Sequence, residues 1–472
     1  MTQQQKAFLI LLLLPVVVRL LSFFPSVIDH DESTYLVIAD AISKGHTYQV
    51  DYIDTKPIGI FLIFAALKPL LGHSIFGYRL VAALTLGLTS FFLYRAKRSM
   101  GSTHAAGLAA GILYILLNSI YTRYGVSPNT ETYFNLFTAL SLWIFLSKPP
   151  VWGYFLAGIG LGAGFVIKYV VLFDGLAWGL FLVVLALTRE GNVVKALARA
   201  FVMAIGAALP FALVISWYLK QGHFDTFWFH SFTVAGRYPS SRGLGHYLGF
   251  FFQFFARFLP ATLLYVIALR QKELPGDTRL FGIIWSIATL CSVLIPGNAF
   301  GHYYIQFMLP FSFLAGEFFS LPAQQTPSWL RWARRPRIGY PLLGLLLIGH
   351  LLLQKKDYLD RPDNVRAAAA YIDARLQPGE AIYTQEDQAI YYLTDRLPLT
   401  RYVHPSLFWL DKHIEAMEIP LDNEIRKITA ANPRFMVFRV PVEDERFAAY
   451  RTKYYEPVAD IGGYVQIFER KK

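Results

Sequence analysis

Cysteine and charged residues are both scarce in this sequence. Its 472 residues include a single cysteine, Cys291, which excludes an internal disulfide and a cysteine-based zinc cluster. Only 16% of the residues are charged, against roughly 25% in ordinary soluble domains. Hydrophobic residues make up 55% of the chain, and the mean hydropathy is +0.39. This composition argues against a soluble globular protein and indicates a membrane protein.

The formal net charge of +12 would suit nucleic-acid binding if it were spread over a soluble domain. From Lys355 onward, however, 18 lysines and arginines face 19 aspartates and glutamates. The excess basic charge therefore belongs to the apolar part of the chain. Basic loops between apolar runs indicate membrane topology, and we expect no nucleic-acid partner.

Long apolar runs predict a mainly α-helical, polytopic membrane protein with about eleven transmembrane helices, since a span needs ~20 apolar residues. The expected spans cover residues 7–28, 75–94, 104–121, 131–147, 152–168, 170–188, 198–218, 247–269, 280–296, 303–321 and 338–354. The first run is expected to be a retained anchor, because no small-residue cleavage pattern follows it. We therefore predict a membrane body over residues 1–355 and a soluble domain over 356–472.

The basic residues predict the orientation, because loops rich in lysine and arginine stay on the cytoplasmic side. With the N-terminus inside, the inner loops carry Arg95, Lys97, Arg98, Lys148, Arg189, Lys195, Arg199, Arg270, Lys272, Arg279, Arg331, Arg334, Arg335 and Arg337. Residues 57–71 are apolar enough to span, but counting them would move Arg95 outside. We expect an interfacial or re-entrant segment there, within an outer loop of about residues 29–74.

An odd number of spans places the C-terminal domain outside the cytoplasm, as a periplasmic domain in a bacterium. Possible strands at 381–384, 435–438 and 464–468 alternate with helical stretches at 365–376 and 421–431, which predicts a small α/β domain. Two roles are open for this domain. It either handles an acceptor or acts only as a stabilising cap.

The first outer loop carries the densest group of acids. Asp29, Asp31 and Glu32 directly follow the first span, and Asp40, Asp51 and Asp54 come next. Carboxylates beside a bilayer are costly unless they face water, a metal or a cation. One of them could act as a general base on a hydroxyl or hold a divalent cation against a phosphate. A solvated acidic loop at a helix end is the simpler alternative.

Four further residues are expected on the same outer face. Lys56 precedes a proline at the membrane edge, and Glu131 begins the fourth span. Lys168 lies between two apolar runs and needs a partner or a cavity, while His302 stands before a late span. Each also has an ordinary explanation, as a snorkelling lysine, a helix-start acid or an interfacial histidine. Their coincidence on one side is the stronger argument for a site.

Other patterns in the sequence are less informative. Gly158, Gly160, Gly162 and Gly164 lie inside an apolar span, which favours close helix packing over a nucleotide loop. No P-loop, HExxH pair or nucleophile elbow is present in the sequence. The aromatic residues of 224–247, with Arg237 and Arg242, either line a lipid or sugar groove or form an ordinary interfacial belt.

Taken together, these motifs resemble those of the polytopic C-type glycosyltransferases. The shared features are an Asp-Glu pair after the first span, a Lys-Pro segment, an acid starting the fourth span and a His-Tyr motif entering a late span. The most similar groups are the aminoarabinose transferases and the protein O-mannosyltransferases, with the bacterial galacturonosyltransferase-like members. The resemblance covers about residues 1–355 and implies the C-type glycosyltransferase fold.

The resemblance also implies an activity and residue roles. A sugar would pass, with inversion, from a polyprenyl-phosphate donor to a hydroxyl of a lipid, glycan or protein on the periplasmic face. Asp31 would be the catalytic carboxylate, supported by Glu32, and Lys56 and Lys168 would bind the donor phosphate. The remaining candidates for substrate binding are Glu131, His302, Tyr303 and Arg237. No cofactor is certain, although a divalent metal on Asp31 or Glu131 is possible.

Two other classes of function remain open. A lipid-linked sugar flippase or transporter would need paired ionisable residues at midplane and related halves. Lys168, Asp174, Arg257 and Glu317 lie within or near spans, but no internal repeat is evident in the sequence. A noncatalytic envelope scaffold would tolerate removal of the loop acids.

Overall fold

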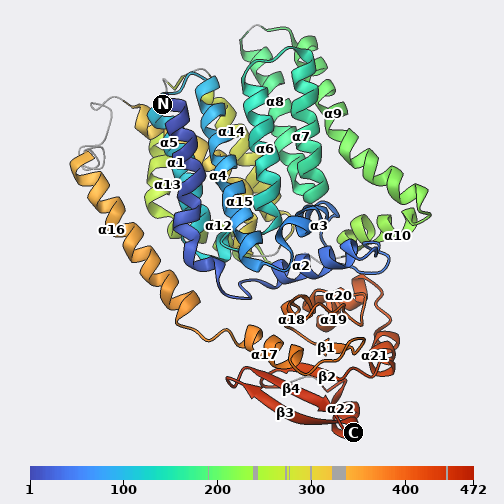
Figure 1. Cartoon of the computed structure of the whole chain (residues 1–472). Coiled ribbons are helices and arrows are strands. Elements are labelled where there is room, and N and C mark those ends of the chain that lie inside the picture. The colour runs from blue at the N-terminus through green and yellow to red at the C-terminus, as the bar shows by residue number, and fades with distance from the viewer. Residues whose placement is uncertain are drawn as a thin grey trace. The chain divides into compact units, whose positions relative to one another are not determined.

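The computed structural model describes residues 1–189, 191–237, 243–271, 274–275, 277–297, 300–321, 336–442 and 445–472 (Figure 1). Among the basic residues used above, Arg242, Lys272, Arg331, Arg334 and Arg335 lie outside these ranges. The chain divides into two compact units. The first comprises residues 1–23, 79–217 and 240–355, and the second comprises 24–78, 218–239 and 356–472.

The first unit is helical. Its elements are α1 (Gln3–Arg19), η1 (Leu20–Phe23), α4 (Ile75–Ser99), α5 (His104–Ser119), η2 (Thr122–Tyr124), α6 (Thr130–Leu146), α7 (Val151–Ile167), η3 (Tyr169–Val171), α8 (Leu172–Thr188), α9 (Val193–Lys220), α12 (Leu244–Arg257), α13 (Leu259–Arg270), α14 (Thr278–Leu294), η5 (Gly301–Tyr303), α15 (Tyr304–Ala315), η6 (Gly316–Ser320) and α16 (Pro336–Gln354). Helices α6, α7 and α8 lie side by side in Figure 1.

Each of the eleven predicted spans falls on helical structure. Four helical segments of the described chain are long and apolar enough to cross a bilayer, namely residues 3–23, 75–99, 169–188 and 193–220. The span expected at 247–269 is instead a pair of helices, α12 and α13, bent by 94°. Counting this pair as one span gives five, so the total of eleven stays a prediction.

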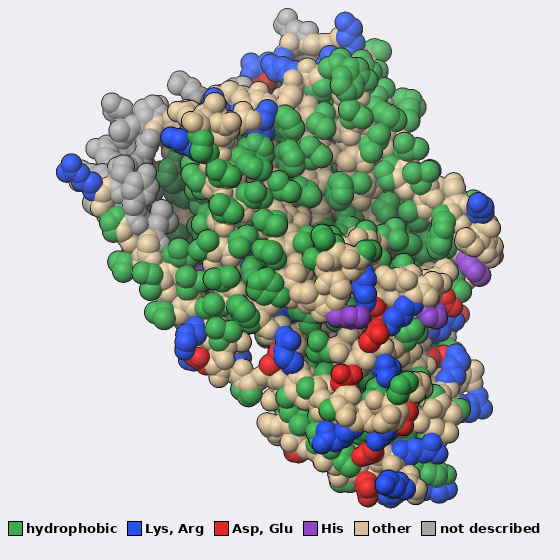
Figure 2. All heavy atoms as spheres, in the orientation of Figure 1, with side chains coloured by type: hydrophobic (Ala, Val, Ile, Leu, Met, Phe, Trp, Pro, Cys, Tyr) green, Lys and Arg blue, Asp and Glu red, His purple; other side chains and the backbone are tan. Residues whose placement is uncertain are grey.

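The surface of the helical unit is suited to lipid. Hydrophobic side chains cover its visible face, whereas charged side chains concentrate on the second unit (Figure 2). Helix α9 shows the pattern most clearly, because exposed apolar residues recur every fourth position along it. They are Leu197, Phe201, Ile205, Leu209 and Leu213. Such a stripe is stable only against an apolar medium, which supports an integral membrane protein.

The glycines of α7 serve helix packing, as predicted. A Cβ atom added to Gly158 would lie 2.1 Å from the Met203 carbonyl oxygen of α9, and one on Gly162 would lie 2.2 Å from that of Ala207. On the α6 side, a Cβ on Gly160 would lie 2.0 Å from the Ser141 hydroxyl. Only a hydrogen atom fits at these positions, so the glycines let helix backbones approach closely.

The second unit combines loop helices with the C-terminal domain. Its elements are α2 (His30–Ser43), α3 (Gly59–Leu71), α10 (Phe224–Trp228), η4 (Phe229–Thr233), α11 (Val234–Arg237), η9 (Lys355–Leu359), α17 (Asn364–Asp373), β1 (Ile382–Thr384), α18 (Ala389–Leu393), α19 (Pro405–Trp409), α20 (Asp411–Ala416), α21 (Leu421–Ala430), β2 (Phe435–Arg439), α22 (Ala448–Tyr454), β3 (Tyr455–Ile461) and β4 (Val465–Arg470). The segment at 57–71, expected at the interface, therefore contains the helix α3.

The sheet of the C-terminal domain has the strand order β1-β2-β4-β3. Strands β1 and β2 are parallel, and β4 runs antiparallel to both β2 and β3. Strands β1, β2 and β4 match the sequence expectation, whereas β3 was not predicted. The reason is that β3 is an edge strand with an irregular register at Pro457 and a single buried residue, Tyr455, so it lacks a buried alternating pattern.

The outer loop pairs with the C-terminal domain within this unit. The Ile53 backbone N–H donates to the Arg401 carbonyl oxygen at 2.7 Å, and the Val403 N–H donates to that of Ile53 at 3.3 Å. The side chains of Ile53 and Tyr402 belong to one buried core with β2 and α19. Because this short bridge fixes residues 401–403 beside the loop, it determines what meets Asp31.

Candidate active site

Helix α2 begins at the acidic motif of the first outer loop. Asp29 caps the helix, since its side chain accepts a hydrogen bond from the Asp31 backbone N–H at 3.0 Å. Asp31 and Glu32 occupy the first turn, where the helix dipole stabilises negative charge. The two acids differ in access: the Asp31 side chain is 13% exposed, whereas Glu32 is 1% exposed. Asp31 is thus the acid of this pair that solvent or substrate can reach.

Lys56 is the cationic partner of Asp31. Its Nζ lies 2.5 Å from Asp31 Oδ1 and 3.5 Å from the nearer oxygen of Asp54. The following proline favours an extended backbone at Lys56, and the Tyr48 hydroxyl donates to the Lys56 carbonyl oxygen. The structure therefore brings together two residues that the sequence separates by 25 positions, as expected for a carboxylate–ammonium centre.

Asp54 adds a carboxylate that the sequence interpretation did not single out. Its side chain is 1% exposed, and neither carboxylate oxygen accepts a hydrogen bond among the described residues. The ammonium of Lys56 at 3.5 Å is its ion-pair partner. A buried carboxylate is costly without a cation nearby. The ion pair therefore stabilises the charge of Asp54, and it also restrains the position of the Lys56 ammonium. In the sequence Asp54 was one of six acids in the loop, and only its position two residues before Lys56 set it apart from the others.

His404 is the second residue that sequence reasoning missed. It comes from the C-terminal domain, 373 positions after Asp31 in the numbering, and its Nε2 lies 3.3 Å from Asp31 Oδ1. The side chain also caps α19, because Nδ1 accepts from the Ser406 backbone N–H at 3.2 Å. Nothing in the local sequence distinguishes His404 from a loop histidine before a proline, since only the folded chain brings it to Asp31.

Two further histidines, His30 and His413, lie near Asp31 and Lys56, and both are neutral at neutral pH. Burial, with a smaller effect of the Arg439 guanidinium, lowers the pKa of His30 below its usual value. The His30 ring lies within 3.2 Å of that guanidinium, which Asp387 holds by an ion pair of 2.6 Å. Burial and the nearby charge of Lys412 lower the pKa of His413 to about 4. The centre therefore gains no positive charge from either ring at neutral pH.

The other candidates gather in the helical unit. Lys168 follows the last residue of α7 and forms an ion pair with Glu131, which lies in the first turn of α6. The Lys168 Nζ also lies 4.4 Å from the centre of the Tyr303 ring, and His302 interacts electrostatically with Glu131. These four residues thus form one group. Its expected union with Asp31 and Lys56 in a single pocket stays a prediction.

Arg237 stands apart from both groups. Its guanidinium donates to Glu418 at 2.6 Å and stacks over the Phe229 ring at 5.2 Å. A shallow pocket of about 300 Å³ lies on the same segment, lined by Phe224, Asp225, Trp228, Phe229 and Thr233. Its aromatic walls are of the kind that sugar rings or lipid chains contact, and both a groove and an interfacial belt remain open for these aromatics.

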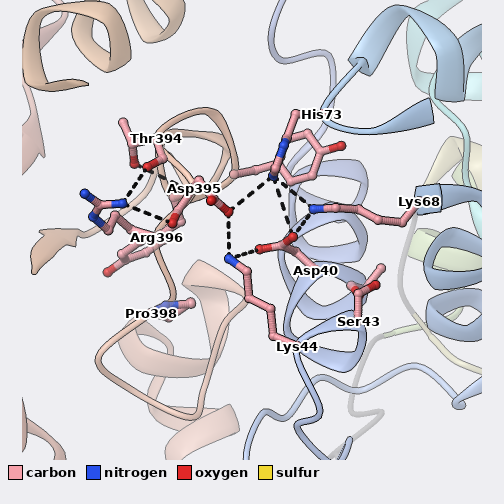
Figure 3. Close-up of polar contacts among 12 residues, drawn as sticks. Asp40, Ser43, Lys44, Lys68, His73, Thr394, Asp395, Arg396 and Pro398 are labelled. Atoms are coloured by element: carbon pink, nitrogen blue, oxygen red, sulfur yellow. Dashed lines mark hydrogen bonds and ion pairs between the residues drawn. The ribbon is translucent and has the colours of Figure 1, made fainter. Parts of the chain in front are cut away.

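A second polar cluster connects α2 with the C-terminal domain (Figure 3). Asp40, 2% exposed, pairs with Lys68 and, at 2.8 Å, with Lys44. Lys44 also reaches Asp395 at 2.7 Å, and His73 Nε2 lies 3.6 Å from Asp40 Oδ1 and 3.5 Å from Asp395 Oδ1. In Figure 3 the side chains of Lys68, His73 and Lys44 converge on Asp40, and His73 and Lys44 also reach Asp395.

The donor atoms of this cluster are close enough together to hold a metal ion. Those of Asp40, His73 and Asp395 lie within 4.8 Å of one another. The two carboxylates already have two ammonium partners, however, so their charge is balanced without a divalent cation. We therefore interpret the cluster as a network of ion pairs that joins α2 to the C-terminal domain. The metal expectation concerned Asp31 and Glu131, and this grouping does not involve either residue.

The ionisable residues considered for transport have partners within the helical unit. Glu317 and Lys97 form an ion pair in which both side chains are fully buried. Asp174 accepts hydrogen bonds from Trp285 Nε1 at 2.5 Å and from Gln306 Nε2 at 2.7 Å. Arg257 lies over the rings of two tyrosines at 5.2 and 5.3 Å. Each group is thus accounted for by packing.

Comparisons with known proteins agree on a relationship. The profile of the dolichyl-phosphate-mannose-protein mannosyltransferase family matches residues 55–217. The undecaprenyl phosphate-alpha-4-amino-4-deoxy-L-arabinose arabinosyl transferase 2 of Pseudomonas fluorescens is 31% identical over 39% of this chain and 31% of its own length. A transferase 1 of the same species is 24% identical over 71% of this chain and 63% of its own. The chain therefore matches between about a third and two thirds of these relatives.

Solved structures extend the similarity to the fold. ArnT from Cupriavidus metallidurans, bound to undecaprenyl phosphate, aligns with a TM-score of 0.68 over 98% of this chain and 97% of that one, at 15% sequence identity. The apo oligosaccharyltransferase of Archaeoglobus fulgidus aligns with a TM-score of 0.52 over 96% of this chain and 73% of its own. At these identities the structural likeness supports a shared fold.

Proposed function

We propose that the chain belongs to the superfamily that unites the aminoarabinose transferases with the protein O-mannosyltransferases, and that it is a glycosyltransferase with a polyprenyl-phosphate-linked sugar donor. The donor is of the class named for its relatives, an undecaprenyl-phosphate sugar. The acceptor is a hydroxyl group on a lipid, glycan or protein. We place the reaction on the extracytoplasmic side of the plasma membrane, with the N-terminus in the cytoplasm and the C-terminal domain outside.

The proposed reaction is a single displacement with inversion at the anomeric carbon. The acceptor oxygen forms a bond to that carbon while the bond to the phosphate oxygen breaks, and the electron pair leaves with the polyprenyl phosphate. The proton of the acceptor hydroxyl passes to the carboxylate of Asp31, which acts as general base. Glu32, which is buried, lies beside Asp31 in the first turn of α2 and supports it.

The leaving phosphate needs positive charge nearby, because electrostatic stabilisation is usually the largest catalytic contribution. Lys56 supplies it in the proposal, since its ammonium is partly exposed and meets Asp31 at 2.5 Å. Lys168 contributes a second ammonium, oriented by Glu131, while His302 and Tyr303 contact the substrates. Arg237 binds substrate only if its ion pair with Glu418 opens. Asp31 and Glu131 remain the candidates for a divalent cation.

One observation carries the proposal: an accessible carboxylate and an accessible ammonium, from separate segments, meet at the start of the first outer loop. A transfer centre needs access for the acceptor and the donor phosphate. The similarity to glycosyltransferases favours a transfer centre over the flippase and scaffold alternatives.

The test is reconstitution of the full chain with synthetic polyprenyl-phosphate sugars, combined with mass spectrometry of envelope lipids, glycans and proteins from cells with and without the gene. The proposal expects release of polyprenyl phosphate and loss of one sugar substituent in the deletion strain. An unchanged envelope together with movement of the intact donor across vesicles would instead indicate a flippase. An unchanged envelope with neither activity would favour a scaffold.

A further inference from the structure

We infer that His404 of the C-terminal domain is a positioning residue for Asp31, so that the domain completes the transfer site as well as capping it. The inference rests on the proposed function of Asp31. The C-terminal domain, whose part in the reaction was open, would then help to hold the catalytic carboxylate in place. The inference also predicts that the membrane body without this domain lacks full activity even if it folds.

The backbone determines where His404 lies. Residues 401 and 403 hydrogen-bond to the backbone of Ile53, at 2.7 and 3.3 Å, which places the next residue beside the loop that carries Lys56. The Arg401 side chain adds a hydrogen bond of 2.6 Å to the Val50 carbonyl oxygen. His404 is the N-cap residue directly before α19, and its Nε2 lies 3.3 Å from Asp31 Oδ1. Three separate contacts thus hold the segment in register.

The hydrogen-bond network defines which ring nitrogen carries the proton. Nδ1 accepts from the Ser406 backbone N–H at 3.2 Å and lies 2.7 Å from the Ser406 hydroxyl. A nitrogen that accepts a backbone N–H has no proton of its own, so a neutral His404 carries its proton on Nε2. That nitrogen is the one 3.3 Å from Asp31 Oδ1, so its N–H group lies next to the carboxylate and makes a favourable electrostatic contact with it.

The carboxylate is held from two sides. Lys56 and His404 both meet Asp31 at Oδ1, at 2.5 and 3.3 Å, so rotation of the carboxylate would break two contacts at once. A base held in one orientation loses less freedom when the acceptor hydroxyl arrives. The half-buried rings of His30 and His413 lie close by, the first with its centre 6.5 Å from that of His404, and Lys412 adjoins His413.

The same ring has two jobs that substitution can separate. Its Nδ1 caps α19, and its Nε2 contacts Asp31. In His404→Asn the amide oxygen can still cap the helix, because asparagine is among the best N-cap residues, but the side chain is too short to reach Asp31. In His404→Gln the longer amide reaches the position of Nε2 and donates a hydrogen bond, while the cap weakens. The pair therefore distinguishes positioning from capping.

The experiment measures kcat, donor KM and thermal unfolding for full-length wild type, His404→Asn and His404→Gln. We expect kcat to fall about tenfold or more in the asparagine variant, because the Asp31 carboxylate loses the ring that restricts its orientation, with donor KM and melting temperature near wild type. We expect the glutamine variant to keep kcat within about threefold of wild type, even if its melting temperature falls.

Two results would overturn the inference. The first is wild-type kcat in His404→Asn. The second is a loss of kcat in both variants that simply follows their melting temperatures. A double-mutant cycle with Asp31→Glu separates the remaining case, since a residue acting through Asp31 gives non-additive losses and an independent one gives additive losses. A wild-type protein that transfers no sugar would reject the proposed function instead, whatever the His404 variants show.

Discussion

Replacing Lys56 with methionine removes the ammonium and keeps most of the side-chain volume. In the proposed site this ammonium contacts the donor phosphate, and a hydrogen bond to a charged group is worth about 1.5–3 kcal/mol. Because every 1.4 kcal/mol corresponds to about a factor of ten, donor affinity is expected to fall about ten- to a hundredfold. The turnover number is also expected to fall, since the same charge stabilises the leaving phosphate.

The substitution also has a cost in stability. Asp54 is 1% exposed and would lose its ammonium partner, and breaking a buried ion pair from one side costs about 3–5 kcal/mol. The cost here should lie below that range, because Lys56 is 19% exposed and water can approach the pair. Thermal unfolding must therefore be measured beside the kinetics.

The assay is sugar transfer by the purified full chain at varied donor concentration, well below the melting temperature of each variant. Lys68→Met is the matched control, because it removes the ammonium from the buried Asp40 in the same unit without touching the proposed site. It should lower stability and leave donor KM unchanged. Equal effects of both variants on donor KM, or no effect of Lys56→Met on KM and kcat, would refute the reasoning.

Two further predictions concern stability. Because the pKa of His413 is lowered to about 4, the unfolded chain takes up its proton near pH 6.5 while the folded chain stays neutral. The second unit should lose stability as the pH falls from about 6.5 to 4, by roughly 3 kcal/mol at most, and His413→Gln should flatten this part of the unfolding profile. In the membrane body, Gly162→Ala should lower the melting temperature, because its Cβ would lie 2.2 Å from a carbonyl oxygen of α9. Gly175→Ala is its control, since the added Cβ would lie at an ordinary 3.6 Å from Leu161, and equal melting temperatures would contradict the packing account.

Local signals in the sequence were enough to predict much of the fold. Apolar runs predicted the positions of the helices, because a helix that faces lipid is apolar along its length whatever it packs against. The exposed apolar residues of α9 are an example. The break between α12 and α13 at Phe258 was missed because both halves are apolar and were read as one span, although Pro260 in the first turn of α13 is a residue that often starts a new helix. The edge strand β3 was missed because only one of its seven residues is buried, so no alternation of apolar and polar residues marks it.

The site was predictable only where its residues lie close in sequence or follow a recognised motif. Asp31 and Lys56 fall in one loop and do meet in the structure. Lys168 was singled out because a lysine between apolar runs needs a partner, and Glu131 is that partner. His404 was not predictable, because its relation to Asp31 depends on backbone pairing between distant segments. Burial decides the importance of Asp54, and burial appears only in the folded chain.

The most direct test of the account is the activity of Asp31→Asn, measured with purified full-length protein and a polyprenyl-phosphate sugar under single-turnover conditions. Asparagine keeps the shape of the side chain and removes the base, so the account predicts a loss of about a hundredfold or more in the transfer step, with membrane insertion and melting temperature near wild type. Transfer by Asp31→Asn at the wild-type rate would contradict it.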